Sequence, residues 1–85
     1  MLTQGFSVYY SPLDYLGTKT QGVITAIRNK DEKIVKQLLA MGVRIGMNIT
    51  LEKRFPAFVI RVGRTRITIN KNLASSIKVR VTSKN

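Results

Sequence analysis

The spacing of hydrophobic residues changes at the middle of the chain, from a helical period to a strand period. In the segment 30–42 the apolar residues fall three and four positions apart, as on one face of an α-helix. Asp31 is a favourable N-cap, and Gly42 can adopt the left-handed conformation that ends many helices. The pattern predicts a helix here, with an apolar stripe of Ile34, Val35, Leu38, Leu39 and Met41.

After Gly46 the apolar residues occupy every second position, which is typical of half-buried strands. The residues expected on the core side are Met47, Ile49, Leu51, Phe58, Ile60, Val62, Ile67, Ile69, Ile77, Val79 and Val81. An earlier β-branched segment, 21–29, predicts one further strand, and 70–76 is expected to be a turn-rich connection. We therefore predict a mainly β fold with one inserted helix, a small five-stranded antiparallel barrel. Gly42 and Gly46 would form the structural corner between helix and barrel.

The first part of the chain is harder to interpret. Residues 1–10 include Phe6, Tyr9 and Tyr10 but show no clear period, so a flexible tail, an added edge strand and an oligomer contact all remain open. Residues 11–17 predict one helical turn, capped by Ser11, that places Leu13 and Leu16 in the core. These boundaries suggest an N-terminal arm over 1–10, one domain over 11–82 and a short C-terminal tail over 83–85.

The composition bears on function mainly through charge. The 85 residues hold 15 Lys and Arg against 4 acidic residues, a net charge of +11. Such a surface attracts polyanions, anionic lipid headgroups or an acidic protein, although it can also serve only as a solvated surface. The chain has no Cys and no His, so we expect no disulfide, no metal site, no cofactor and no catalytic residues. The protein is accordingly predicted not to be an enzyme.

Two further observations concern location. The N-terminal residues lack the basic and apolar regions of a secretory signal peptide. No segment approaches the ~20 apolar residues that span a bilayer. We therefore expect a cytoplasmic protein without a membrane span.

An ordered set of residues resembles the FeoA family of small proteins associated with bacterial ferrous iron uptake. The set runs from the helix end through the alternating strands, and residues 11–81 share it: Leu38, Leu39, Met41, Gly42, Gly46, Ile49, Pro56, Gly63, Ala74, Ile77 and Val79. The resemblance implies an SH3-like barrel that acts as a docking accessory to FeoB, a membrane-bound iron transporter with a GTP-binding cytosolic domain. This chain departs from the family pattern in having Ile45 where proline is common, Ile67-Thr68-Ile69-Asn70 in the fourth strand and a short loop around Pro56.

The same family often carries a metal-related description. The residues of this chain argue against a metal site, because neither thiolate nor imidazole ligands are available and the carboxylates are few. We therefore predict that docking, not metal binding, is the activity of the barrel.

Three surfaces are candidates for a partner. The first is a basic set on the C-terminal strands together with one loop aromatic: Arg61, Arg64, Arg66, Lys78, Arg80 and Phe55. Its basic residues could instead serve only solubility and protection of sheet edges. The second is an apolar corner of Met41, Val43, Ile45, Phe55 and Phe58, most of which are expected in the core. The third is the aromatic arm.

Nucleic-acid binding is the alternative function. Small basic barrels bind single strands through a positive groove with stacked aromatic side chains. Phe55 and Phe58 beside Lys53 and Arg54 come nearest to this pattern, but no predicted strand carries paired outward aromatics. Charge alone predicts only weak, nonspecific and salt-sensitive nucleic-acid binding. The sequence leaves the oligomeric state unknown.

Overall fold

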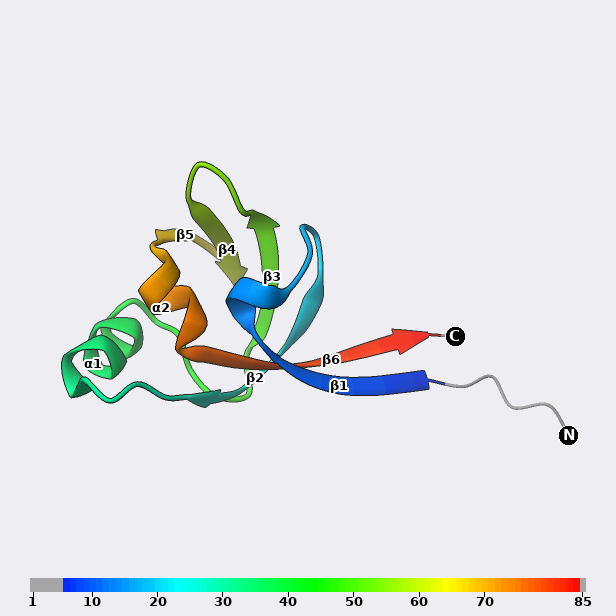
Figure 1. Ribbon diagram of the computed structural model, residues 1–85, viewed down its shortest axis with the longest axis horizontal. Coiled ribbons are helices and arrows are strands. Elements are labelled where there is room, and N and C mark those ends of the chain that lie inside the picture. Colours follow the sequence, from blue (N-terminus) through cyan, green and yellow to red (C-terminus); the bar gives the residue numbers. More distant parts are fainter. Residues whose placement is uncertain (1–5, 85) are drawn as a thin grey trace, which may run out of the picture.

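A computed structural model of the protein describes residues 6–84 and shows one curled antiparallel sheet with three short helical segments (Figure 1). The strand order is β1-β6-β2-β3-β4-β5. The strands are β1 Phe6–Pro12, β2 Gln21–Ile27, β3 Asn48–Lys53, β4 Phe58–Val62, β5 Thr65–Ile69 and β6 Ile77–Lys84. The helical segments are a 3-10 turn η1 at Leu13–Tyr15, α1 at Glu32–Ala40 and α2 at Lys71–Ser75.

Alternation along the strands builds the core as predicted. The buried members are Ile49, Leu51, Phe58, Ile60, Val62, Ile69, Ile77, Val79 and Val81, with Met47 and Ile67 packed against them. The strand register brings these side chains together, since Leu51 lies opposite Ile60 and Phe58 lies opposite Ile69. The polar residues between them consequently face outward along each strand.

Helix α1 begins and ends where the sequence predicts. The Asp31 side chain accepts a hydrogen bond from the Lys33 N–H at 2.9 Å, which caps the helix start. At the other end the N–H of Gly42 donates to Leu39 and that of Val43 donates to Leu38, the paired bonds of a Schellman motif. Gly42 has a φ of +96°, as this motif requires. Of the predicted stripe only Leu38 is fully buried, and Leu39 is exposed.

The second glycine forms a turn that docks onto the sheet. Gly46 has a φ of +92°, and the Met47 N–H donates to the Arg44 carbonyl across it at 3.2 Å. The Gly46 N–H donates to the Ile24 carbonyl on β2 at 2.7 Å. The two glycines therefore form the predicted corner, and hydrogen bonds fix that corner against β2.

The short helical segments cover the core at one end. Leu13 and Leu16 are buried as predicted, but Ser11 lies in β1 and does not cap the turn, which has no side-chain cap. Helix α2 was not predicted. Asn70 caps it by accepting from the Leu73 N–H at 2.8 Å, and Leu73 and Ala74 are buried. None of the helices within residues 6–84 is long and apolar enough to cross a membrane.

The prediction of five strands closing into a barrel is wrong for the described residues, which form six strands in an open sheet with β1 and β5 at its edges. The additional strand is β1, which takes most of its residues from the segment left open as an arm. It pairs with β6 from Phe6 opposite Lys84 to Pro12 opposite Lys78. The predicted domain boundaries at 10/11 and 82/83 therefore fall inside β1 and β6. Residues 1–5 and 85 lie outside the described part.

Candidate functional site

The outward side chains of the central strands form one continuous surface, which we call the outer face. Strand pairing places Gln21 of β2 opposite Thr50 of β3, Thr50 opposite Arg61 of β4, and Arg61 opposite Arg66 of β5. Nearer β1, Arg80 of β6 lies opposite Val23 of β2. The outer face is therefore polar and carries cations at both ends.

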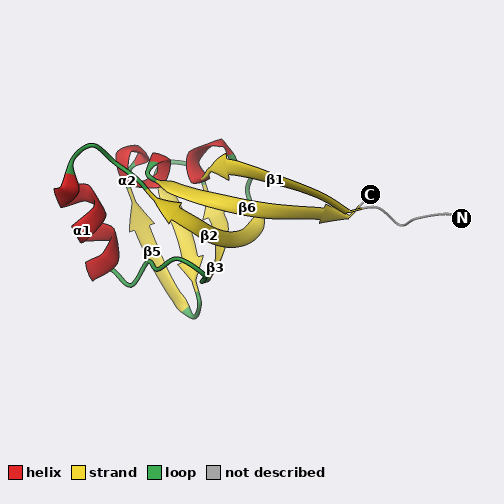
Figure 2. Ribbon diagram, turned by 90° about the horizontal axis from the view of Figure 1, so that it is seen from below, coloured by secondary structure: helices red, strands yellow, loops and turns green. Residues whose placement is uncertain are grey.

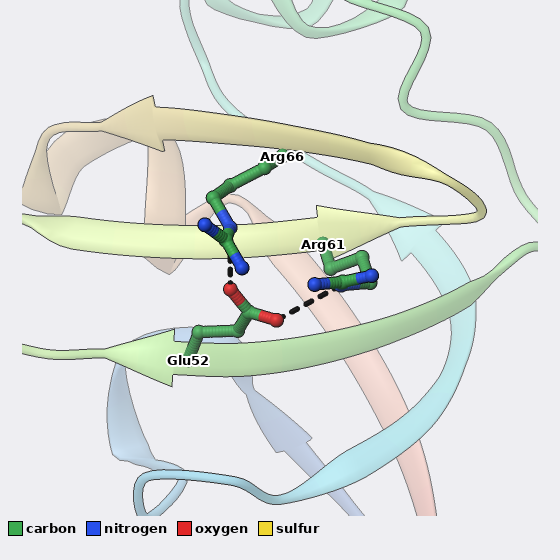
Figure 3. Close-up of polar contacts among 3 residues, drawn as sticks. All are labelled: Glu52, Arg61 and Arg66. Carbon is green, nitrogen blue, oxygen red and sulfur yellow. Dashed lines mark hydrogen bonds and ion pairs between the residues drawn. The ribbon is translucent and has the colours of Figure 1, made fainter.

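Glu52 joins two of the predicted partner-binding arginines (Figure 3). Its carboxylate accepts from Arg61 Nε at 2.9 Å and from Arg66 Nε at 2.7 Å. The hydrogen bond from Arg61 holds the pKa of Glu52 below its ordinary value, and the charges of both arginines act in the same direction against partial burial. The side chains come from three adjacent strands, so the sheet register itself positions them.

The other predicted cations are not part of this group. Arg64 is exposed in the turn between β4 and β5. Lys78 is half-buried on β6 and donates from Nζ to the Ser75 carbonyl at 2.9 Å. Arg80 is exposed on β6, which is separated from β4 by β2 and β3. The structure thus separates Arg61 and Arg66, which share Glu52, from Lys78 and Arg80 on β6. It does not bring the predicted basic set together.

Two hollows on the outer face lie between Arg66 and Arg80. The larger, of about 570 Å³, is lined by Lys19, Gln21, Thr50, Glu52, Lys53, Val59, Arg66 and Thr68. The smaller, of about 390 Å³, is lined by Gln21, Gly22, Val23, Asn48, Ile49, Thr50, Arg80 and Thr82. They share Gln21 and Thr50, so a shallow path runs from Arg66 to Arg80.

The apolar candidates are divided between core and surface. Phe55 is 86% exposed in the loop between β3 and β4, at the opposite end of β4 from Arg64. Ile45 is also exposed, whereas Val43 and Phe58 are buried in the core. The predicted apolar corner is therefore not a continuous apolar groove, and Phe55 is the member available to a partner.

Two residues that sequence reasoning did not select also shape the site. Lys19 lines the larger hollow and has a φ of +71°, which is uncommon outside glycine. Its N–H donates to the Leu51 carbonyl, which fixes the loop against β3. Glu52 follows the core-facing Leu51, so the strand period places it on the outward side. Its outward position was readable, but its two arginine partners depend on the strand register.

The described residues also bear on metal binding. Within residues 6–84 no group of three or more His, Cys, Asp or Glu side chains could hold a metal ion. Asp14 is buried, and its Oδ1 has no hydrogen-bond partner among the described residues. A lone carboxylate does not supply the several ligands that a divalent cation needs.

Comparisons with known proteins give the relationships of the chain. The FeoA domain model matches residues 11–81. A curated relative from Leptolyngbya boryana, named "Putative Fe(2+) transport protein A", is 31% identical over 78 residues, covering 91% of this chain and 95% of that protein.

Solved structures agree with this relationship. A crystal structure described as an iron uptake regulatory protein, FeoA, is 27% identical, with a TM-score of 0.74 over 84% of this chain and 95% of that one. The zinc complex of Stenotrophomonas maltophilia FeoA, described as a prokaryotic SH3 domain protein, is 20% identical, with a TM-score of 0.67 over 76% of this chain and 84% of that one.

The second of these structures supports the SH3-like character of the curled sheet. The family match covers most of the described fold, including the outer face, both corner glycines and the buried residues of β3 to β6. This chain belongs to the FeoA domain family, which is associated with ferrous iron transport.

Proposed function

We propose that this protein is a non-enzymatic accessory of ferrous iron transport that docks, in the cytoplasm, onto the GTP-binding part of a FeoB-type transporter. The family relationship supports the transport role. The observation that carries the docking proposal is the outer face, where Arg66 and Arg80 line two adjoining shallow hollows. The docking residues are Arg61, Arg64, Arg66, Lys78, Arg80 and Phe55.

In this proposal these residues have different roles. Arg64 and Arg80 are exposed and make no ion pair with any acidic residue in 6–84, so they attract an acidic partner at long range. The Lys78 ammonium donates a hydrogen bond to the Ser75 carbonyl, so Lys78 contributes to docking mainly through its charge.

Arg61 and Arg66 are held in place before any partner arrives. Each contacts Glu52 through Nε, and the terminal guanidinium nitrogens of both have no hydrogen bond within the described residues. A guanidinium held in a fixed orientation loses less side-chain entropy when it binds a carboxylate. Glu52 thus orients two arginines toward an acidic surface while reducing the net charge of the face.

Phe55 supplies an apolar contact at the other end of β4. Exposed aromatic side chains on a rigid scaffold are common anchors of protein interfaces. The adjacent Pro56 restricts the backbone at this position, so less conformational entropy is lost when Phe55 becomes buried.

The test compares two double charge reversals of equal net charge. Arg64→Glu/Arg80→Glu changes the outer face, and Lys33→Glu/Lys36→Glu makes the same change on the exposed side of α1. Association with the purified cytosolic GTPase domain of a FeoB-type transporter is measured by stopped flow at low and at physiological salt. We expect the first variant to associate at least ~10-fold more slowly at low salt, and the second to remain near wild type.

The same proteins are titrated with a single-stranded RNA at matched ionic strength. If the protein acts by docking, it should bind the RNA more weakly than the GTPase domain. Both double variants should then lose the same RNA affinity, because nonspecific RNA binding depends only on net charge. Equal association rates of the two variants with the GTPase domain would contradict the docking face, provided both unfold at the wild-type temperature. Tighter binding of RNA that depends on Arg64 and Arg80 would favour the nucleic-acid alternative.

A further inference from the structure

Strand β1 lies at the edge of the sheet, with β6 on one side and no strand on the other in the described part of the chain. Beyond the region where β6 also pairs with β2, β1 and β6 continue together as a two-stranded ribbon (Figures 1 and 2). Side chains here are uncovered, with Val8 52% and Tyr9 44% exposed. Isolated two-stranded ribbons are marginally stable in water.

The two edges of the sheet differ in charge. Strand β5, at the other edge, carries the exposed cation Arg66. Residues 1–12, which include all of β1, contain no charged side chain, although the whole chain carries a net charge of +11. Natural proteins commonly protect edge strands with charges, especially lysine, against pairing with another strand. β1 lacks this protection and is the edge suited to pairing.

We propose that β1 pairs antiparallel with β1 of a second copy of this chain, forming a two-fold symmetric dimer with a continuous sheet. A two-fold axis places the same strand opposite itself. Tyr9 is the central residue of Phe6–Pro12, so an axis at Tyr9 gives the longest overlap. In this register Val8 of each copy lies opposite Tyr10 of the other, an aromatic and β-branched pair of the kind that stabilises sheets.

The lack of charge on β1 favours a second copy of this chain, not an acidic protein, as its pairing partner. An uncharged strand has no electrostatic attraction for an acidic protein, whereas the outer face has it. The cations that the register places opposite β1 are Lys78, Arg80 and Lys84, all on β6. In the dimer the two β6 strands are separated by both β1 strands, about 14 Å at the usual strand spacing. This separation exceeds the Debye length of ~8 Å at physiological salt, so repulsion between the copies is largely screened.

Most of β1 lies outside the segment that the family model matches, which supports a role for β1 in addition to docking. Residues 6–10 lie outside the segment 11–81 that the FeoA domain model matches. The exposed residues Val8, Tyr9 and Tyr10 all fall in this additional part. The dimer edge therefore lies on a different strand from the docking residues, although Tyr10 of β1 is directly opposite Arg80 of β6.

The test is sedimentation velocity of the full chain over a range of concentration and salt. We expect a reversible dimer with a dissociation constant of about 10–100 μM, because paired edge strands bury less than the ~1,200 Å² of a standard interface. Rising salt should leave the dimer unchanged or strengthen it, since the copies carry the same charge.

Two matched variants locate the interface. Tyr10→Lys and Tyr15→Lys each add one cation in place of an exposed tyrosine, but Tyr15 lies on η1 and is 79% exposed there. We expect Tyr10→Lys to weaken the dimer at least ~10-fold, because two-fold symmetry introduces the change twice. Tyr15→Lys should dimerise as wild type. A monomeric wild type at the highest concentration, or equal effects of the two variants, would overturn the proposal.

A cysteine cross-link tests the register. The chain has no cysteine, so one introduced thiol reports a single position. Tyr9→Cys should form a disulfide dimer under mild oxidation, since residues facing each other across paired strands satisfy the separation that disulfides require. Tyr15→Cys should not. Equal cross-linking of both variants would show random collision. Loss of binding to the GTPase domain in Tyr10→Lys, with a monomeric wild type, would assign β1 to that partner instead.

Discussion

Arg54 donates a hydrogen bond from Nη1 to the main-chain carbonyl of Asp14 at 2.8 Å, linking positions 40 residues apart in the sequence. The same nitrogen donates to the carbonyl of Leu16. The guanidinium carbon lies 5.5 Å from the centre of the Phe58 ring, within the range of a cation–π contact. Arg54 therefore connects the end of β3 to the turn η1 that covers the core.

We expect Arg54→Ala to lower the free energy of unfolding by about 1–2 kcal/mol, because two carbonyl groups lose a charged donor. Lys53→Ala is the matched control, since the Lys53 side chain is exposed and makes no hydrogen bond or ion pair within the described residues. Urea unfolding of the two variants measures the difference. Equal stabilities would show that the Arg54 contacts contribute nothing.

The corner between α1 and β3 predicts opposite effects for two neighbouring substitutions. Gly42→Val should destabilise the fold by about 1–3 kcal/mol, because a β-branched residue is strained at positive φ even though no atom obstructs a Cβ there. Ile45→Pro should be neutral or stabilise by about 0.4–1 kcal/mol, since Ile45 precedes Gly46 at the turn position that favours proline.

Thermal and urea unfolding of both corner variants provide the measurement. Gly42→Ala serves as an intermediate control, because it adds a Cβ without β-branching. If Ile45→Pro is the more damaging change, the turn from Arg44 to Met47 does not have the hydrogen-bonded form described above.

The ion pairs of Glu52 predict a pH dependence of stability. The pKa of Glu52 is lowered from its ordinary value of 4.5, so the folded state binds this proton less readily than the unfolded state. The stabilisation is complete above the unfolded pKa and is lost as pH falls through the folded pKa. Glu52→Gln should therefore flatten the stability profile below about pH 4.5. An unchanged slope in that range would contradict the pairing.

Metal binding by the isolated protein should be weak. We expect dissociation constants for Fe(II) and Zn(II) no tighter than about 1 mM, because thiolate and imidazole ligands are missing. The zinc complex of the S. maltophilia relative makes this a useful comparison. Calorimetric titration of the tag-free protein is the measurement, and a stoichiometric micromolar site would refute the expectation.

Sequence patterns predicted the elements that bury one clear face. The strands from Asn48 to Val81 alternate because each packs one side on a single core, and α1 is bounded by recognisable caps at Asp31 and Gly42. β1 could not be recognised in this way. Its outer part, around Val8 and Tyr9, is exposed on a two-stranded ribbon, so neither face imposes a period. Helix α2 has five residues, too few to show a helical repeat, although Asn70 is a readable cap.

The candidate site was predictable only as a set of outward positions. Alternation placed Arg61, Arg66 and Arg80 on the outside, and the structure agrees. Their grouping depends on strand order and register. Those features bring Glu52 to Arg61 and Arg66 and leave Arg80 two strands away from β3. Long-range pairing of this kind is set by the whole core, so no local pattern reports it.

The position of β6 has a consequence for the order of folding. β6 is the last strand of the described chain to be synthesised, yet it lies between β1 and β2. The hairpins β3–β4 and β4–β5 need only short loops to close and can form while the ribosome is still adding residues. Within the described chain β1 pairs with β6 alone, so it cannot join the sheet until β6 has left the ribosome. The sheet is therefore completed only after β6 has emerged, however early the central hairpins form.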